Sequence, residues 1–126
     1  MKKIKTDKAP KTVGPYSQAV VAGDFVFCSG QIALDPFSGV LVRGGIAPQT
    51  KRVFENLKAV LQAAGARFED VTSVNVYLTD MDNFKAMNDV YAEVFAGDMK
   101  PARVTVGVSA LPKNALVEIS CVAYVA

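Results

Sequence analysis

Strand-like and helix-like hydrophobic patterns alternate along the chain. Residues 20–27 are mostly apolar on both sides of a Gly-Asp pair, which predicts two strands joined by a tight turn. Residues 71–79 place apolar and polar side chains alternately, as a strand with one buried face does. Two further strands are predicted around 103–109 and 116–125.

The first helix-like pattern lies between two glycine signals. Gly44-Gly45 precedes it, and Gly65 suits its C-terminal end. Pro48 fits the first turn, because a backbone N–H has no partner within the helix there. The buried face is predicted to consist of Val53, Leu57, Val60, Leu61 and Ala64.

A second helix is predicted after residue 80. Asp80 or Asp82 can cap its first turn, and Gly97 is expected to end it. The inward stripe is predicted to consist of Phe84, Met87, Tyr91, Val94 and Phe95.

These elements predict a single α+β domain that spans residues 1–126. Two helices can cover only one face of a sheet of five or six strands. Residues 25–28 and 117–126 are nonetheless largely apolar on both faces. We therefore expect a homo-oligomer in which the uncovered faces of the sheets pack together.

Composition argues against disorder and against strong nucleic-acid binding. Hydrophobic residues make up 51% of the chain and charged residues 21%, which is typical of a folded domain. The net charge of +2 is weakly basic. The basic residues near the N-terminus are Lys2, Lys3, Lys5, Lys8 and Lys11. We interpret them as a solvated, frayed start, with an RNA or phosphate patch as the alternative.

Localisation signals are lacking in the sequence. The basic start leads into polar residues rather than an apolar signal segment, and no apolar run reaches the length of a membrane span. Cys28 and Cys121 lie in apolar segments and are predicted to be buried thiols. These features favour a reducing, cytoplasmic environment.

The chain contains no histidine, which limits its chemistry. Catalytic systems of the Ser-His-Asp and Cys-His types are excluded, as are the usual zinc ligand sets. Acid–base catalysis must therefore use Asp, Glu, Tyr, Lys, Cys, backbone groups or water.

Two segments near the N-terminus are candidate ligand contacts. Tyr16 follows Gly14-Pro15 and supplies an aromatic wall with a polar tip, although such a segment is also a common way to begin a strand. Ser29-Gly30 ends an apolar strand, where glycine allows a ligand to approach the backbone. A simple bulge or turn is the alternative for the second segment.

Two charged residues lie in predicted strands near the C-terminus. Strand alternation puts Arg103, Thr105 and Gly107 on one face of a strand that we expect to be central. A guanidinium there can bind a carboxylate through two parallel hydrogen bonds, or can form a structural ion pair. Glu118, if partly desolvated, has a raised pKa and can act near neutral pH. The alternatives are that Glu118 faces solvent or pairs with Arg103.

The combination of these segments is far more specific than any one of them. In chain order they are Gly14-Pro15-Tyr16-Ser17-Gln18-Ala19, Ser29-Gly30-Gln31, Asn88 within Phe84–Tyr91, Pro101-Ala102-Arg103, Leu111-Pro112-Lys113 and Glu118-Ile119. The set resembles the RidA/YjgF family of reactive-intermediate deaminases over essentially the whole chain. The resemblance implies a chorismate-mutase-like α+β fold and a homotrimer, with sheets inside, helices outside and clefts between subunits.

The resemblance also implies an activity, that of a 2-iminobutanoate/2-iminopropanoate deaminase. Such an enzyme hydrolyses 2-imino acids, or their enamine tautomers, to 2-keto acids and ammonia, and it needs no cofactor or metal. The implied roles place the substrate carboxylate on Arg103 and the attacking water on Glu118. Tyr16, Ser29, Gly30 and, less strongly, Asn88 are implied to line the cleft.

One position departs from the family pattern. Many active members carry a cysteine two residues after the arginine, whereas this chain has Thr105. An imine is already electrophilic and its hydrolysis needs no covalent step. We therefore expect Thr105 to change the shape and polarity of the pocket rather than abolish activity.

Two other functions remain open at this stage. The same clefts can bind a small carboxylate without catalysis, as a sensor or a chaperone-like module would. An RNA-cleaving, translation-inhibiting role is a third possibility, but the missing histidine and modest charge count against it.

Overall fold

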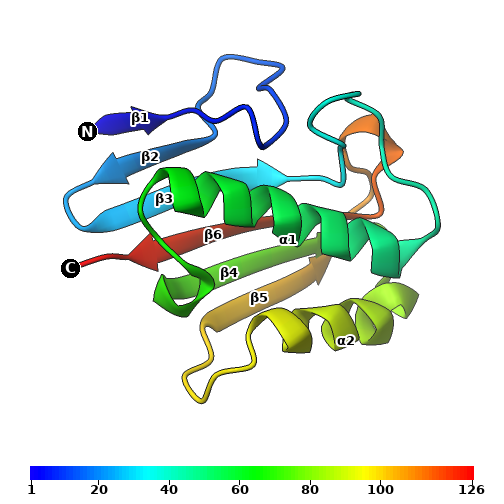
Figure 1. Ribbon diagram of the computed structural model, residues 1–126. Coiled ribbons are helices and arrows are strands. Elements are labelled where there is room, and N and C mark those ends of the chain that lie inside the picture. The colour runs from blue at the N-terminus through cyan, green and yellow to red at the C-terminus, as the bar shows by residue number, and fades with distance from the viewer.

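A six-stranded sheet forms the base of the molecule, described over all 126 residues in a computed structural model. The strands are β1 (Lys2–Ile4), β2 (Ala19–Ala22), β3 (Phe25–Gln31), β4 (Val71–Leu78), β5 (Ala102–Gly107) and β6 (Val117–Tyr124). The helices α1 (Ile46–Ala63) and α2 (Phe84–Val94) both lie on one face of this sheet (Figure 1). The predicted α+β architecture, with two helices on one face, is confirmed.

The strand order is β1-β2-β3-β6-β4-β5. Only β4 and β5 run parallel; every other neighbouring pair is antiparallel. The last strand of the chain, β6, therefore lies between β3 and β4. The strand that carries Arg103 is β5, at the edge of the sheet, so the prediction that this strand is central was wrong. Strand order depends on pairing between distant segments, which local hydrophobicity does not reveal.

Helix α1 and the strands beneath it form most of the core. Val53, Leu57, Val60 and Leu61 are all at most 1% exposed, as predicted for the inward face of this helix. Ala64, the fifth residue predicted for this face, follows the last helical residue and is only partly buried. Strand β4 alternates as predicted, with Val74, Val76 and Leu78 buried under the helices. Both patterns could be predicted from the sequence because each element has one solvent-exposed face and one buried face.

Helix α2 differs from its prediction at both ends. The Asp80 carboxylate caps a short 3₁₀ turn by accepting a hydrogen bond from the Asp82 N–H, and α2 itself begins at Phe84. The helix ends at Val94, before Gly97, because Phe95 leaves the helical conformation and buries its ring. That ring packs edge-on against Phe54 and Phe68.

The inward side of α2 is only partly as predicted. Met87 and Val90 are buried, and Val90 was not part of the predicted stripe. Phe84, Tyr91 and Val94 are only partly buried, because α2 lies along the edge strand β5 (Figure 1). A helix at a sheet edge has less surface to cover it.

The N-terminus is ordered as a strand, contrary to the predicted frayed start. Lys2–Ile4 pairs with Ala19–Val21 of β2, and the Ile4 side chain is 5% exposed. A strand of three residues with a single buried side chain is too short to produce a readable period. Backbone pairing with the free edge of β2 holds it in place.

The second face of the sheet carries no helix (Figure 1). Its side chains alternate with the buried ones, and several are large and apolar. The exposed apolar side chains of this open face are Phe25, Phe27, Val104, Val106 and Tyr124, each between 39% and 54% exposed. An apolar face of this extent suits contact with another protein surface, so the homo-oligomer stays a prediction with clear physical motivation.

Neither helix combines the length and apolarity needed to cross a lipid bilayer. Cys28 and Cys121 are free and buried, as predicted, and they face each other across β3 and β6.

Candidate functional site

The predicted site residues form two groups on opposite faces of the sheet. Strand β6 buries Val117 and Ile119 under the helices, so Glu118 between them points to the open face. Strand β5 pairs Arg103 with Val74, whose side chain is buried on the helix side. Arg103 and Glu118 therefore cannot meet within one chain, which excludes an ion pair between them in a single subunit.

The first group surrounds a cavity of about 200 Å³ on the open face, which we call the Glu118 cavity. Its wall includes Tyr16, Gly30, Ile32, Leu34, Lys113 and Glu118. These residues come from the loop before β2, from β3 and the loop that follows it, and from β6 and the loop before it. The cavity thus joins three segments that are distant in sequence.

Gly30 makes room for the carboxylate of Glu118. A Cβ atom at residue 30 would lie only 2.7 Å from Glu118 Oε2 and 2.9 Å from its Cδ. The sequence left open a ligand contact or a simple bulge at this glycine. The strand register does shift between Cys28 and Gln31, the group next to Gly30 is Glu118, and the ligand contact stays a prediction. The position of the Glu118 carboxylate therefore requires a glycine at residue 30.

Glu118 is a partly buried acid without a partner. Its carboxylate forms no hydrogen bond and no ion pair with the rest of the chain. Burial raises the pKa of this carboxyl group above its usual range. The ionisable groups around it are Lys11, Tyr16 and Lys113 in the cavity wall and Tyr77 on the neighbouring strand. Such a carboxyl group can accept and release a proton closer to neutral pH than an exposed one.

Ser29 lies beside the Glu118 cavity rather than in its wall. Its hydroxyl donates a hydrogen bond to the Ser17 carbonyl at 2.6 Å, and its N–H donates to the Gln18 carbonyl. These bonds hold the loop that carries Tyr16. The structure therefore gives Ser29 a supporting contact, while its predicted contact with substrate stays a prediction.

The second group, which we call the Arg103 cluster, lies between β5 and α2. Arg103 Nη1 donates a hydrogen bond to Asn88 Oδ1 at 2.6 Å. The Arg103 Cζ lies 4.6 Å from the centre of the Tyr91 ring and 5.6 Å from that of Phe84. Aromatic faces stabilise a guanidinium without neutralising it. No carboxylate pairs with Arg103, so most of its N–H donors remain free for an anion.

Two buried hydroxyls in the same region lack hydrogen-bond partners. They are the hydroxyl of Tyr91 and Oγ1 of Thr105, which lies on the same face of β5 as Arg103. Burial raises the pKa of Tyr91, against the opposing effect of the Arg103 charge. Buried polar groups normally find a partner, so these two hydroxyls are available to hydrogen-bond a group that binds beside Arg103.

Two buried polar residues of α1 position the loops of the Glu118 cavity, and the sequence analysis missed both. Asn56 is fully buried and donates hydrogen bonds to the carbonyls of Ile32 and Leu34, at 3.1 and 3.0 Å. Gln49 accepts a hydrogen bond from the Leu116 N–H at 3.0 Å. The available signal was an asparagine within the apolar stripe of a helix. These bonds place the start of the 34–45 loop at the cavity.

No group of three or more His, Cys, Asp or Glu side chains is arranged to hold a metal ion. The groups that the two parts of the site do offer are a cation, a titratable acid and hydroxyl groups.

The amino-acid sequence matches a known family over nearly its whole length. The family model described as endoribonuclease L-PSP matches residues 6–125. The chain belongs to this family, also called YjgF/RidA.

Curated members of the RidA/YjgF family align over nearly the full chain. A RutC family protein of Pyrococcus abyssi is 55% identical over 121 residues, which cover 96% of this chain and 94% of the relative. A 2-iminobutanoate/2-iminopropanoate deaminase of Dermatophagoides farinae is 45% identical over 119 residues, which cover 94% and 92%.

A solved structure shares the fold closely. The crystal structure of TdcF from E. coli with bound serine is 36% identical, covers 100% of both chains and has a TM-score of 0.95. The α+β arrangement described above is thus the family's fold.

Proposed function

We propose that this protein hydrolyses 2-imino acids, or their enamine tautomers, to 2-keto acids and ammonia. The observation that carries the proposal is the pair of complementary half-sites: a cation with free donors at Arg103, and a titratable, unpartnered carboxyl group at Glu118. A relative 45% identical to this chain bears the name of such a deaminase. A small anionic substrate needs both a clamp and a proton carrier.

The two half-sites are proposed to come together between subunits of a homotrimer. Each chain offers Glu118 on its open, apolar face and Arg103 at the exposed edge of its sheet. Val104 and Val106 extend the open face along the same edge strand. Packing the edge of one copy against the open face of the next would bury these valines and bring the two groups together. Closed symmetry would repeat the contact around a ring.

In the proposed reaction the substrate carboxylate binds Arg103 through two parallel hydrogen bonds. Asn88 holds the guanidinium from α2 through one hydrogen bond from Nη1 and leaves its other donors for the substrate. Fixing one end of the substrate places the C=N carbon near the Glu118 cavity of the adjoining subunit. Orientation of this kind removes much of the entropic barrier to reaction.

The chemical steps need only water and one carboxyl group. Glu118 accepts a proton from the attacking water as the C–O bond forms, and the imine nitrogen takes up a proton to give a tetrahedral amino alcohol. Glu118 then passes its proton to the amino nitrogen, so that the C–N bond breaks with release of ammonia. The hydroxyl proton passes to water as the keto acid forms, which replaces the proton that the imine nitrogen took up and leaves Glu118 ionised for the next turnover. Thr105 in place of the frequent cysteine is compatible with this route, because no covalent intermediate with the protein is formed.

Activity is tested with an imine generated in the reaction vessel by a pyridoxal-phosphate dehydratase acting on threonine or serine. We expect the protein to accelerate the release of ammonia and keto acid above the spontaneous rate. Arg103→Ala should lose this acceleration, and Arg67→Ala, which removes a guanidinium from a weak exposed ion pair, should retain it. An Arg103→Ala protein with full activity would contradict the carboxylate clamp.

The site between subunits is tested by mixing two inactive variants. Arg103→Ala and Glu118→Gln proteins are unfolded together and refolded as mixed oligomers. A cleft that takes Arg103 from one variant and Glu118 from the other is intact, so activity should return to a substantial fraction of the native level. If both groups acted within one chain, the mixture would stay inactive.

A second candidate is a small-carboxylate binding module without catalysis. It is favoured by Thr105, whose unpartnered hydroxyl stands where many active relatives have a cysteine. TdcF with bound serine shows that one relative binds a small amino acid. In that case a 2-keto acid would bind and depend on Arg103, while imine decay would not accelerate.

A further inference from the structure

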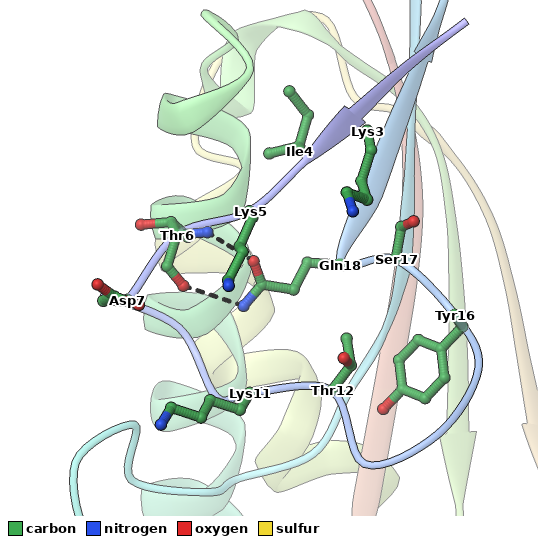
Figure 2. A pocket seen from close by; sticks show the side chains of 10 residues that line it. All are labelled: Lys3, Ile4, Lys5, Thr6, Asp7, Lys11, Thr12, Tyr16, Ser17 and Gln18. Carbon is green, nitrogen blue, oxygen red and sulfur yellow. Dashed lines mark hydrogen bonds between the residues drawn. The ribbon is translucent and has the colours of Figure 1, made fainter.

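A buried glutamine organises the N-terminal segment into a defined surface. Gln18 is 4% exposed, and its side-chain amide bonds to the backbone on both sides of a loop. Its Oε1 accepts a hydrogen bond from the Thr6 N–H at 2.7 Å, and its Nε2 donates to the carbonyls of Thr6 and Pro10 at 3.1 and 2.9 Å. Figure 2 shows the first two of these bonds at the wall of a cavity. A fully satisfied buried amide holds the loop in one conformation.

This loop, β1 and the segment around Tyr16 enclose a cavity of about 450 Å³, which we call the lysine cavity. Its charged and polar lining includes Lys3, Lys5, Lys11, Asp7, Thr12 and Tyr16. Three lysines and a single aspartate are thus among the residues that line it. None of the three lysines forms an ion pair, since the ion pairs of the chain all lie elsewhere.

The lysine cavity lies beside the Glu118 cavity. Lys11, Thr12, Tyr16 and Gln18 line both. Lys3 pairs with Val20, and Val20 pairs with Phe27, so strand register places Lys3 on the open face of the sheet. Tyr16 is therefore a wall between a titratable acid on one side and a cluster of cations on the other.

We propose that the lysine cavity binds a small anion with two or more negative charges, such as the phosphate or diphosphate group of a small metabolite. Three lysines and one aspartate leave an excess of two positive charges, which a single carboxylate would not balance. The hydroxyls of Thr12 and Tyr16 add neutral donors that suit phosphate oxygens. The volume is in the range of small-molecule sites, whereas an RNA-binding surface would extend as a long basic stripe.

The proposal is tested by an NMR titration of the isotope-labelled full chain with pyrophosphate, at ionic strength held constant with sodium chloride. We expect saturable shifts in backbone amides of residues 3–18, centred on Thr6, Thr12 and Ser17. The readout is binding, so it does not depend on whether the protein is a deaminase.

Matched triple variants identify the cations involved. Lys3→Gln/Lys5→Gln/Lys11→Gln should weaken pyrophosphate binding by about tenfold to a hundredfold, because each nearby ammonium group contributes several-fold even in water. Lys51→Gln/Lys58→Gln/Lys85→Gln removes the same charge from exposed lysines of α1 and α2, outside the cavity and outside the N-terminal segment. That control should stay within about twofold of the native affinity, since salt screens distant charges.

Several outcomes would overturn the proposal. Shifts that never saturate, or that fall outside residues 3–18, would show that the cavity is not a site. Equal weakening in both triple variants would indicate diffuse charge attraction. A single-stranded RNA that displaced pyrophosphate and bound more tightly through the same lysines would mark a nucleic-acid surface instead. The shift map of the native protein decides the question even if the cavity variant folds poorly.

Discussion

The Glu118 cavity and the Arg103 cluster have opposite effects on the charge of the side chain for which each is named. Glu118 is partly buried without a hydrogen bond, so its neutral form is favoured and its pKa is raised. Arg103 lies at the sheet edge against aromatic rings and an amide, which stabilise its charge. One region thus supplies a group that can gain and lose a proton, and the other a permanent cation. A site that binds an anion and moves protons needs both kinds of environment, and a single chain keeps them on opposite faces of its sheet.

The largest expected effects separate the roles of these two regions. Glu118→Gln should lower kcat for imine hydrolysis by about a hundredfold or more while a 2-keto acid still binds, because only the proton carrier is lost. Arg103→Ala should lower activity to a similar extent and also abolish keto-acid binding. Steady-state kinetics and calorimetric titration with 2-ketobutyrate measure the two effects. Loss of keto-acid binding in both variants would contradict the assignment of proton transfer to Glu118 and of substrate binding to Arg103.

Gly30→Ala should disturb the acid without removing it. The added Cβ would lie 2.7 Å from Glu118 Oε2, so the carboxylate must move. We expect a loss of activity of about tenfold and a stability loss of roughly 1–3 kcal/mol from overpacking, seen in kinetics and in urea unfolding. Gly97→Ala is the control, because a Cβ there meets nothing within 4 Å. Native activity in Gly30→Ala would show that the position of the Glu118 carboxylate is unimportant.

The raised pKa of Glu118 predicts a specific dependence on pH. Because the folded chain binds this proton more tightly than the unfolded chain, the stabilisation is complete below the ordinary glutamate pKa and is lost as pH rises through the higher folded value. Denaturation midpoints of the native protein should therefore fall over that interval relative to Glu118→Gln. The rate of hydrolysis should rise over the same interval as the carboxylate forms. A rate that is flat there would exclude Glu118 as the base.

Asp35 provides a control, because its expected effect on the pH dependence of stability has the opposite sign. Backbone N–H groups of Ser38 and Phe37 donate to its carboxylate, both at 2.9 Å, and lower its pKa. Its stabilising contribution is present above the ordinary aspartate pKa and is lost as pH falls through the lower folded value. Denaturation midpoints of Asp35→Asn compared with the native protein should show this reversed trend.

The smallest expected effect concerns the support of Arg103. Asn88→Ala removes the hydrogen bond to Nη1 and leaves the aromatic contacts, so KM should rise about three- to tenfold with little change in kcat. Asp89→Asn, on the next residue of α2, breaks only an exposed ion pair with Lys85 and should change neither constant. A fall in kcat alone for Asn88→Ala would mean that Asn88 takes part in the chemistry itself.

Helices and strands with one solvent-exposed face and one buried face were predictable from the sequence. Helix α1 and strand β4 matched their predicted stripes, because burial imposes a period of 3.6 or 2 on the side chains. The three-residue strand β1 was missed because it is shorter than a readable pattern. The end of α2 was misplaced because Phe95 leaves the helix to pack with Phe54 and Phe68, a contact between distant segments.

Local sequence also determined which residues share a face of their own strand. Arg103 and Thr105 lie together, as alternation requires, and the ordered motifs were sufficient to identify the RidA/YjgF family. Only the tertiary structure decided that β6 lies inside the sheet, that β5 lies at its edge, and that Glu118 and Arg103 point to opposite faces. Alternation along a strand determines which of its side chains share a face. Which side meets the helices depends on hydrogen bonds between strands far apart in the chain, and those bonds leave no local pattern.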